Sequence, residues 1–348
     1  MISKIESYLQ EAIDRGVFPG SVLGIIIGEK RFVVARGRFT YDSLSPEMNE
    51  DTLFDCASIT KAIPVSSLAL QFIDEQRIGL ADPLIKYIPE FNGSYREQVQ
   101  IKHLLTHTLN FDFRLSDCKD LPSKEILNLI LSIKMKSPPG TNFFYANATS
   151  ILLGLVLERA GGKSLPELAQ ERIFEPLGMS MSTFFPERSS FVAVPTEEDS
   201  WRGRIIQGEV HDESAWALRS LLVAGSAGLF STVPDLLSFM SVMLGVSGNK
   251  QLFSRSVLDK VQTNQIPHIK DKETGLGWEL NQPYMGKRRT ATTFGKTGFT
   301  GCAIIADRSK NVALVHLSNY TWPKRKSDRS LINEVRSDLA DIVFEMAR

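Results

Sequence analysis

Three short motifs follow one another along the chain, and they constrain the fold more than any other feature of the sequence. They are Ser58-Ile59-Thr60-Lys61, Tyr145-Ala146-Asn147 and Lys296-Thr297-Gly298. Together they supply a hydroxyl with an amine three residues away, a phenol with an amide, and a basic segment that ends in glycine. A serine hydroxyl becomes an effective nucleophile only when a base lies beside it. If the motifs act together, the fold must bring three distant segments to one place.

The first motif has little specificity by itself. The pattern Ser-x-x-Lys also occurs from Ser116 to Lys119 and from Ser247 to Lys250, in polar segments that we expect to be solvated loops. Ser58 instead opens an apolar stretch, Ile59–Ile73, which predicts a buried helix. Residues three apart on a helix share a face, so the Lys61 amine should reach the Ser58 hydroxyl. The alternative is an ordinary helix cap with Lys61 in solvent.

With all three motifs in this order, the chain resembles the serine β-lactamase/penicillin-binding-protein superfamily. The Tyr-x-Asn element makes it similar to class C β-lactamases, to the related family VIII carboxylesterases and to D-aminopeptidase relatives. The resemblance covers nearly the whole chain. Further stretches that match the superfamily are 101–108, 138–141, 174–179, 210–213 and 227–232.

Hydrophobic periodicity predicts an α+β fold. Two β-rich runs, Ser21–Ile27 and Arg31–Arg36, flank a hairpin turn near the N-terminus. Further strands are predicted toward the C-terminus, at Leu276–Leu280, Thr290–Phe294, Phe299–Ala306 and Val312–Ser318. Helices are predicted from the N-terminus to Arg15 and at Asn147–Ala160, Pro234–Leu244 and Ser327–Met346, with a kink at Pro64 in the helix that follows Ser58.

These elements predict an antiparallel β-sheet flanked by the terminal helices, with a large all-helical insert. The resemblance implies the same β-lactamase/transpeptidase-like fold. We expect residues 1–57 and 263–348 to form a discontinuous sheet domain and residues 58–262 to form a mainly helical domain. The active site should lie at the interface between them, which is a usual place for a pocket.

The motifs suggest a catalytic role for three side chains. Ser58 is the expected nucleophile of an acyl-enzyme mechanism, and Lys61 and Tyr145 are the candidate bases. A lysine serves as a base only if burial or a second cation lowers its pKa, and a phenol near two ammonium groups has its anion favoured. The residues alone leave open which of the two accepts the first proton.

The remaining motif residues are predicted to bind substrate. Asn147 should orient Lys61 and the substrate carbonyl, and Lys296, with Thr297 and Gly298, should attract a substrate carboxylate. The resemblance implies an oxyanion hole made of the backbone N–H groups of Ser58 and Phe299. Phe299 replaces the smaller polar residue common in penicillin-recognising members, and its apolar ring suits an acyl chain.

Composition bears on partners and location. The 40 basic and 40 acidic residues balance, which gives no electrostatic case for nucleic acid or for an anionic membrane. The three cysteines match no metal or disulfide scheme, and no cofactor motif occurs. The segment His211-Asp212-Glu213 lacks the spacing of metal ligands and is predicted to anchor a loop, and His107 and Cys56 are predicted core residues. Because no secretion signal is recognised, we expect a cytoplasmic protein.

These observations favour a serine hydrolase that forms an acyl-enzyme on Ser58 and acts on small carboxylic esters. One alternative is amide hydrolysis, by a β-lactamase or a D-amino-acid peptidase. A second is a binding protein that kept the fold without the activity. The sequence leaves open the natural substrate, the choice between hydrolysis and acyl transfer, and the oligomeric state.

Overall fold

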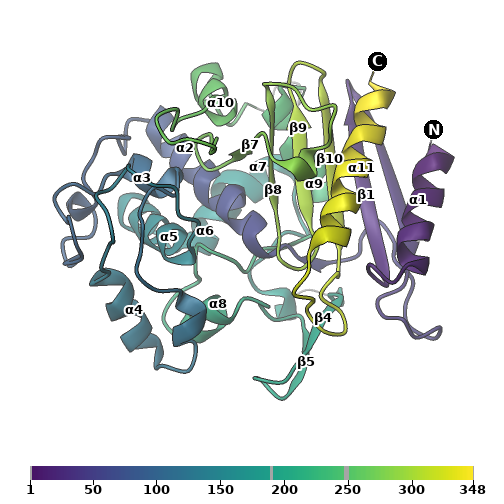
Figure 1. Cartoon of the computed structure of the whole chain (residues 1–348), viewed down its shortest axis with the longest axis horizontal. Helices are drawn as coiled ribbons and strands as arrows, with labels where there is room; N and C mark the ends of the chain where they lie inside the picture. The colour runs from purple at the N-terminus through teal and green to yellow at the C-terminus, as the bar shows by residue number, and fades with distance from the viewer. Residues whose placement is uncertain (1, 189–190, 247–250, 348) are drawn as a thin grey trace.

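A six-stranded antiparallel sheet forms the centre of the computed structural model, which describes residues 2–188, 191–246 and 251–347 (Figure 1). The strand order is β2-β1-β10-β9-β8-β7, so strands from both ends of the chain share one sheet. Their bounds are β1 Gly20–Ile27, β2 Lys30–Gly37, β7 Glu279–Leu280, β8 Thr293–Thr297, β9 Ala303–Asp307 and β10 Val312–Ser318. The predicted antiparallel sheet and α+β class are confirmed.

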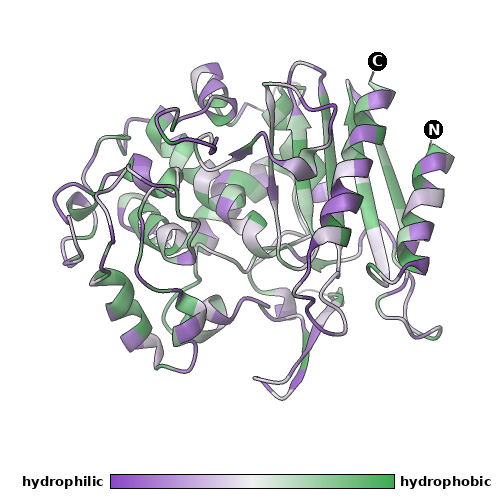
Figure 2. Cartoon of the chain, in the orientation of Figure 1, coloured by the Kyte–Doolittle hydropathy of each residue, from purple (hydrophilic) through white to green (hydrophobic). Residues whose placement is uncertain are grey.

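The two terminal helices cover one face of this sheet. Helices α1 (Ile2–Asp14) and α11 (Ser330–Met346) lie side by side in Figure 1 and bury a shared apolar cluster that includes Leu9, Ile25 and Leu339. Figure 2 shows the hydrophilic residues of both helices on their outer sides. The terminal helices therefore cover this face of the sheet, and α11 also reaches the third motif, because Arg336 donates a hydrogen bond to the Gly298 carbonyl.

The opposite face packs against α9 (Val233–Leu244) and the other helices, around a larger apolar core. Helix α9 begins after Thr232, whose hydroxyl accepts a hydrogen bond from the Asp235 backbone, and ends at Gly245. The other helices are α2 Ser67–Asp74, α3 Ile101–Leu105, α4 Ser123–Leu131, α5 Asn147–Gly161, α6 Leu165–Ala169, α7 Glu175–Leu177, α8 Glu213–Leu218 and α10 Arg255–Gln262. Two small sheets lie beside them: β3 (Phe54–Asp55) with β6 (Phe230–Ser231), and β4 (Pro195–Asp199) with β5 (Arg204–Gln207).

The single helix predicted after Ser58 is wrong. The chain forms a short 3₁₀ helix at Ala57–Lys61, then a π-helical turn at Ala62–Ser66, and only then α2. Ile63 has extended dihedral angles, φ −122° and ψ 112°, because the ring of a following proline disfavours the helical region. The kink expected at Pro64 is present, and it breaks the helix rather than bending it.

Two predicted strands near the C-terminus also have different bounds. Strand β8 runs to Thr297 and so includes the Lys-Thr motif, whereas Thr290–Phe294 was predicted. The predicted strand Phe299–Ala306 begins only at Ala303, because Gly298–Cys302 forms a turn in which Gly301 has a φ of +123°. The third motif therefore ends a strand and opens a turn.

Helix α9, which lies in the range predicted to form the helical domain, packs directly on β1 and β10 of the sheet. The division into two domains stays a prediction. Within the described residues, the structure contains no helix with the length and apolar character needed to cross a bilayer.

Candidate active site

Ser58 lies in a strained turn that buried side chains hold in place. It follows β3, and the preceding residue, Ala57, has a φ of +47°, a conformation that costs energy for any residue with a Cβ. The Asp55 carboxylate fixes this turn, since it accepts hydrogen bonds from the backbone of Ala57 and of His211, each at 2.7 Å. The Ser58 side chain is only partly buried and lines a cavity.

Lys61 reaches Ser58 as the spacing of the first motif predicts. Its Nζ lies 2.9 Å from Ser58 Oγ and also donates a hydrogen bond to the Ser226 carbonyl at 2.7 Å. Only 2% of the Lys61 surface is exposed, so bulk water does not solvate the amine. Although the helix is broken, both residues lie within the same 3₁₀ turn, which preserves their contact.

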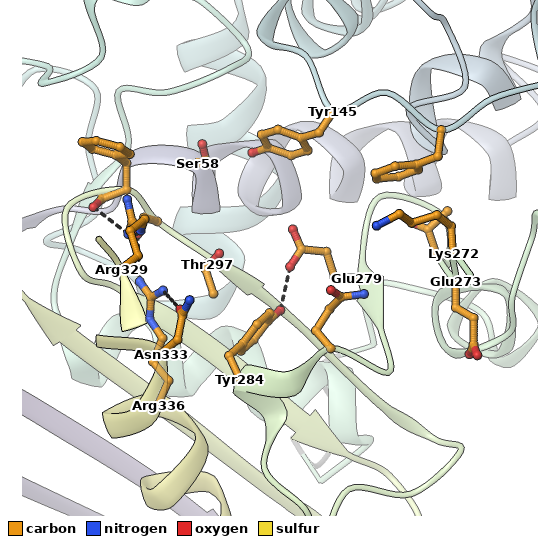
Figure 3. Close-up of a pocket in the computed structure, with 15 residues that line it drawn as sticks. Ser58, Tyr145, Lys272, Glu273, Glu279, Tyr284, Thr297, Arg329, Asn333 and Arg336 are labelled. Carbon is orange, nitrogen blue, oxygen red and sulfur yellow. Dashed lines mark hydrogen bonds between the residues drawn. The ribbon is translucent and has the colours of Figure 1, made fainter. Parts of the chain in front are cut away.

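Tyr145 brings its phenol to the same place from the loop before α5. Although 42% of the residue is exposed, its hydroxyl points toward Ser58 in Figure 3. Burial of the hydroxyl raises its pKa, but the charges of Lys61 and Lys296 and a hydrogen bond with Ser58 outweigh this effect. The pKa of Tyr145 is therefore below its usual value of 10. The two amines lie 5.2 and 4.7 Å from the ring centre.

Asn147 begins α5 and connects the site to Asp212. Its Nδ2 donates hydrogen bonds to the Asp212 carboxylate and to Ser214 Oγ, both at 2.9 Å. Burial raises the pKa of Asp212, but the charge of Lys61 and the hydrogen bonds from Ser214, Ala215 and Asn147 have a larger, opposite effect. The pKa of Asp212 is therefore below its usual value. Asp212 thus supplies a negative charge that faces Lys61, a role that the sequence did not reveal.

Lys296 is buried and ion-paired, which changes the expectation that it attracts a substrate carboxylate. Its Nζ lies 2.9 Å from Glu279 Oε1, and the Tyr284 hydroxyl donates to Glu279 Oε2 at 2.8 Å. Burial lowers the pKa of Lys296, whereas Glu279 and Tyr145 raise it above its usual value. Sequence reasoning missed Glu279. The one available signal is a lone acidic residue within the apolar run Leu276–Leu280.

Gly298 allows the two predicted oxyanion donors to approach each other. A Cβ at this position would lie 2.5 Å from the Cys56 carbonyl, so only glycine lets the end of β8 contact the Ser58 turn. Arg336 of α11 holds the turn from the other side by donating hydrogen bonds to the carbonyls of Gly298 and Cys302, both at 2.9 Å. The backbones of Ser58 and Phe299 are thereby placed on adjoining turns.

A cavity of about 350 Å³ lies between these elements. In Figure 3, Ser58 and Tyr145 face Thr297, Glu279 and Tyr284 across it. Phe299 is 39% exposed at its wall, where its ring stacks on His211 with centroids 5.6 Å apart. The lining residues are Ser58, Phe143, Tyr145, Lys272, Glu273, Thr274, Glu279, Gln282, Tyr284, Thr297, Gly298, Phe299, Arg329, Asn333 and Arg336.

The other sequence candidates have structural roles or lie elsewhere. Ser116 is exposed on a short 3₁₀ turn away from the cavity, and Ser247 to Lys250 lies outside the described residues. His211 contacts Glu197 at 2.8 Å, which agrees with a loop anchor. Cys56 is fully buried, as predicted. In the ranges that the structure describes, no group of three or more His, Cys, Asp or Glu side chains is arranged to hold a metal ion.

His107 is nearer to the site than a core residue was expected to be. Its ring centre lies 4.8 Å from that of Tyr145. Burial lowers the pKa of His107 well below its usual value, and the nearby charges of Lys296 and Lys61 lower it further. The imidazole is therefore neutral and adds no third positive charge beside Tyr145.

Comparisons with related sequences, solved structures and a family model connect this geometry to known proteins. A protein of Escherichia coli O157:H7, provisionally named D-alanyl-D-alanine carboxypeptidase, is 26% identical, and the match covers 91% of this chain and 82% of that protein. The fold is similar to that of EstCE1, described as a hydrolase with promiscuous acyltransferase activity, with a TM-score of 0.77, 19% identity and coverage of 99% of this chain and 98% of that one.

The octameric penicillin-binding protein homologue from Pyrococcus abyssi has a TM-score of 0.75 and 22% identity, over 91% of this chain and 73% of that one. A family model described as Beta-lactamase matches residues 5–337 of the chain, which include all three motifs. The chain therefore belongs to the beta-lactamase family and is a serine hydrolase.

Proposed function

We propose that the protein hydrolyses small, neutral carboxylic esters through an acyl-enzyme on Ser58. The observation that carries this proposal is the cavity wall, where the Phe299 ring is partly exposed and the charge of Lys296 is already paired with Glu279. An apolar acyl chain gains free energy by covering an aromatic ring. A carboxylate would lose its water and meet a lysine that is already neutralised.

In this proposal, Tyr145 accepts the first proton. Lys61 donates hydrogen bonds to Ser58 Oγ and to the Ser226 carbonyl, and in this proposal it acts as an ammonium group. The same ammonium, with Lys296, favours the Tyr145 phenolate. As Ser58 Oγ bonds to the ester carbonyl carbon, its proton moves to Tyr145. Backbone N–H groups of Ser58 and Phe299 stabilise the oxyanion, an effect worth about 3–4 kcal/mol per donor in other enzymes.

Acylation is completed when Tyr145 gives its proton to the departing alkoxide and the C–O bond to the alcohol breaks. Deacylation then uses the same groups. A water molecule then attacks the acyl-enzyme while Tyr145 takes a proton from it. The Tyr145 proton returns to Ser58 Oγ as the carboxylic acid leaves. Asn147, anchored by Asp212, lies beside this path and is proposed to orient the substrate carbonyl.

The test is hydrolysis of p-nitrophenyl butyrate by the wild type and by Ser58→Ala. We expect turnover by the wild type and a loss of at least about 1,000-fold in kcat/KM in the variant, because the covalent route is removed. Equal activity of both proteins would refute the assignment of Ser58. No activity in the wild type would refute ester hydrolysis.

Amide hydrolysis is the second candidate, and two observations favour it. The curated relatives are provisionally named D-alanyl-D-alanine carboxypeptidases, whose substrates end in a carboxylate. Arg329 and Lys272 also bring positive charge to the cavity. Incubation with benzylpenicillin, followed by intact-mass measurement, distinguishes the two. A stable penicilloyl adduct on Ser58, with no ester turnover, would favour amide chemistry.

A further inference from the structure

The Glu279 carboxylate is the least expected group in the cavity. It projects from the edge strand β7 and accepts a hydrogen bond from Lys296 on one oxygen and from Tyr284 on the other. Figure 3 shows the bond with Tyr284. Lys296 is 2% exposed at its side chain, whereas Glu279 is 24% exposed. A substrate in the cavity therefore meets the carboxylate before it reaches the amine.

The pair leaves Lys296 without a free charge to offer. An ammonium group has three donors, but a bound carboxylate already compensates its charge at 2.9 Å. A second carboxylate beside Lys296 would also lie next to Glu279. Like charges at such distances in a partly buried site repel strongly, since little water screens them.

The cations that line the cavity are already engaged or solvated. Arg336 donates hydrogen bonds to the carbonyls of Gly298 and Cys302. Arg329 donates to the Phe299 carbonyl at 3.0 Å and lies over the Phe299 ring, while Lys272 is exposed. Besides Lys61, Lys296 is thus a buried cation close to the reacting groups, with its Nζ 4.7 Å from the centre of the Tyr145 ring.

We propose that Glu279 is a specificity-determining residue, which restricts the site to uncharged substrates by occupying Lys296 and by repelling carboxylates. The inference rests on the proposed esterase function and specifies its substrate class. Replacing Glu279 by glutamine keeps the shape and a hydrogen-bond acceptor for Lys296 but removes the charge. The Lys296 ammonium then becomes available to a carboxylate in the cavity.

The first arm of the test uses the wild type alone. It compares kcat/KM for p-nitrophenyl butyrate with two anionic relatives, mono-p-nitrophenyl glutarate and 3-carboxy-4-nitrophenyl butyrate. One carries its carboxylate on the acyl group and the other on the leaving group. We expect the neutral ester to be preferred at least tenfold over both. Equal or better turnover of either anionic ester would overturn the proposal.

The second arm compares E279Q with E273Q. Glu273 lines the same cavity, but its carboxylate accepts a hydrogen bond from Asn281 and lies away from Glu279 in Figure 3, so E273Q removes one negative charge from the rim. We expect E279Q to raise the anionic-to-neutral ratio of kcat/KM at least tenfold for one anionic ester, and E273Q to change it less than threefold. Equal changes in both variants, or none in E279Q, would overturn the proposal.

The design separates this proposal from the esterase function itself. If the wild type failed to hydrolyse p-nitrophenyl butyrate, the function would fail before any variant was compared. If E279Q did not fold, as circular dichroism would show, the wild-type arm would still decide the question. In that case E279D, which keeps the charge, would extend the comparison and should retain the preference for the neutral ester.

Discussion

At the scale of single residues, the distribution of charge around Tyr145 supports the proposal that its phenol accepts the Ser58 proton. Two ammonium groups lie near the ring, and the neutral His107 adds no third. Glu279 opposes them in part, because its negative charge raises the pKa of Tyr145. The net effect still lowers that pKa and favours the phenolate as the base.

Tyr145→Phe is expected to lower kcat/KM by at least about 100-fold, the usual contribution of a positioned general base. In the wild type, activity should rise with pH as Tyr145 loses its proton, at a pKa below its usual value of 10. The variant should lose this rise. The measurement is a pH profile of kcat/KM for both proteins. Tyr95→Phe, at a partly exposed tyrosine outside the cavity lining, is the control.

A Tyr145→Phe variant that kept the same rise with pH would contradict this assignment and would favour Lys61 as the base. The first motif predicted the Ser58–Lys61 contact because residues three apart lie on the same face of a 3₁₀ or α-helix. The sequence could not predict Glu279 or Asp212 as partners of the lysines. Their contacts cross from one element to another, and no spacing along the chain records them.

At the scale of elements, the end of β8 and the Ser58 turn act as one unit because Gly298 lets their backbones touch. The predicted strand bounds were wrong here for a physical reason. The run from Phe299 to Ala306 is apolar enough for a strand, but Gly298 and Gly301 form a turn that brings Phe299 to the cavity. Apolar pattern alone does not distinguish a buried turn from a strand.

Gly298→Ala is expected to reduce kcat/KM by at least about tenfold, because the new Cβ would push β8 away from the Cys56 carbonyl and separate the two oxyanion donors. Gly154→Ala in α5 is the control, since its Cβ would meet its nearest neighbour at 3.4 Å, an ordinary contact. Steady-state kinetics and thermal melting check both variants. An active Gly298→Ala variant with unchanged kcat/KM would show that this close contact is not needed.

At the scale of the whole molecule, Glu197 joins three parts of the fold. It lies on β4, accepts hydrogen bonds from Arg325 beyond β10, and contacts His211 beside Phe299. Burial raises its pKa, but the bonds from His211 and Arg325 bring the pKa down to about 2. The folded state therefore binds a proton at Glu197 less readily than the unfolded chain does.

This shift gives a prediction for stability. A carboxyl with a depressed pKa stabilises the folded state above its unfolded pKa, near 4.5, and this contribution is lost as pH falls toward 2. Glu197→Gln should therefore lower the free energy of unfolding by up to about 3 kcal/mol at pH 7, with a smaller difference at pH 3. Urea unfolding at several pH values measures this. The exposed neighbour Glu198→Gln is the control.

A difference in the free energy of unfolding between wild type and Glu197→Gln that stayed constant from pH 7 to pH 3 would contradict this linkage.

The general architecture could be predicted, because strands and amphipathic helices at both ends of the chain favour a shared sheet. The strand order could not, since it depends on which edges find partners in space. The β1–β10 pairing, which unites the two ends, is visible only in the structure.

The account depends most on Ser58 as the residue that carries the acyl group. The most direct test is to label the wild type and Ser58→Ala with diethyl p-nitrophenyl phosphate, which phosphorylates activated serines, and to map the product by mass spectrometry. We predict one diethylphosphoryl group per wild-type chain, on the peptide that contains Ser58, and none in Ser58→Ala. Labelling of another residue, or equal labelling of both proteins, would contradict the account.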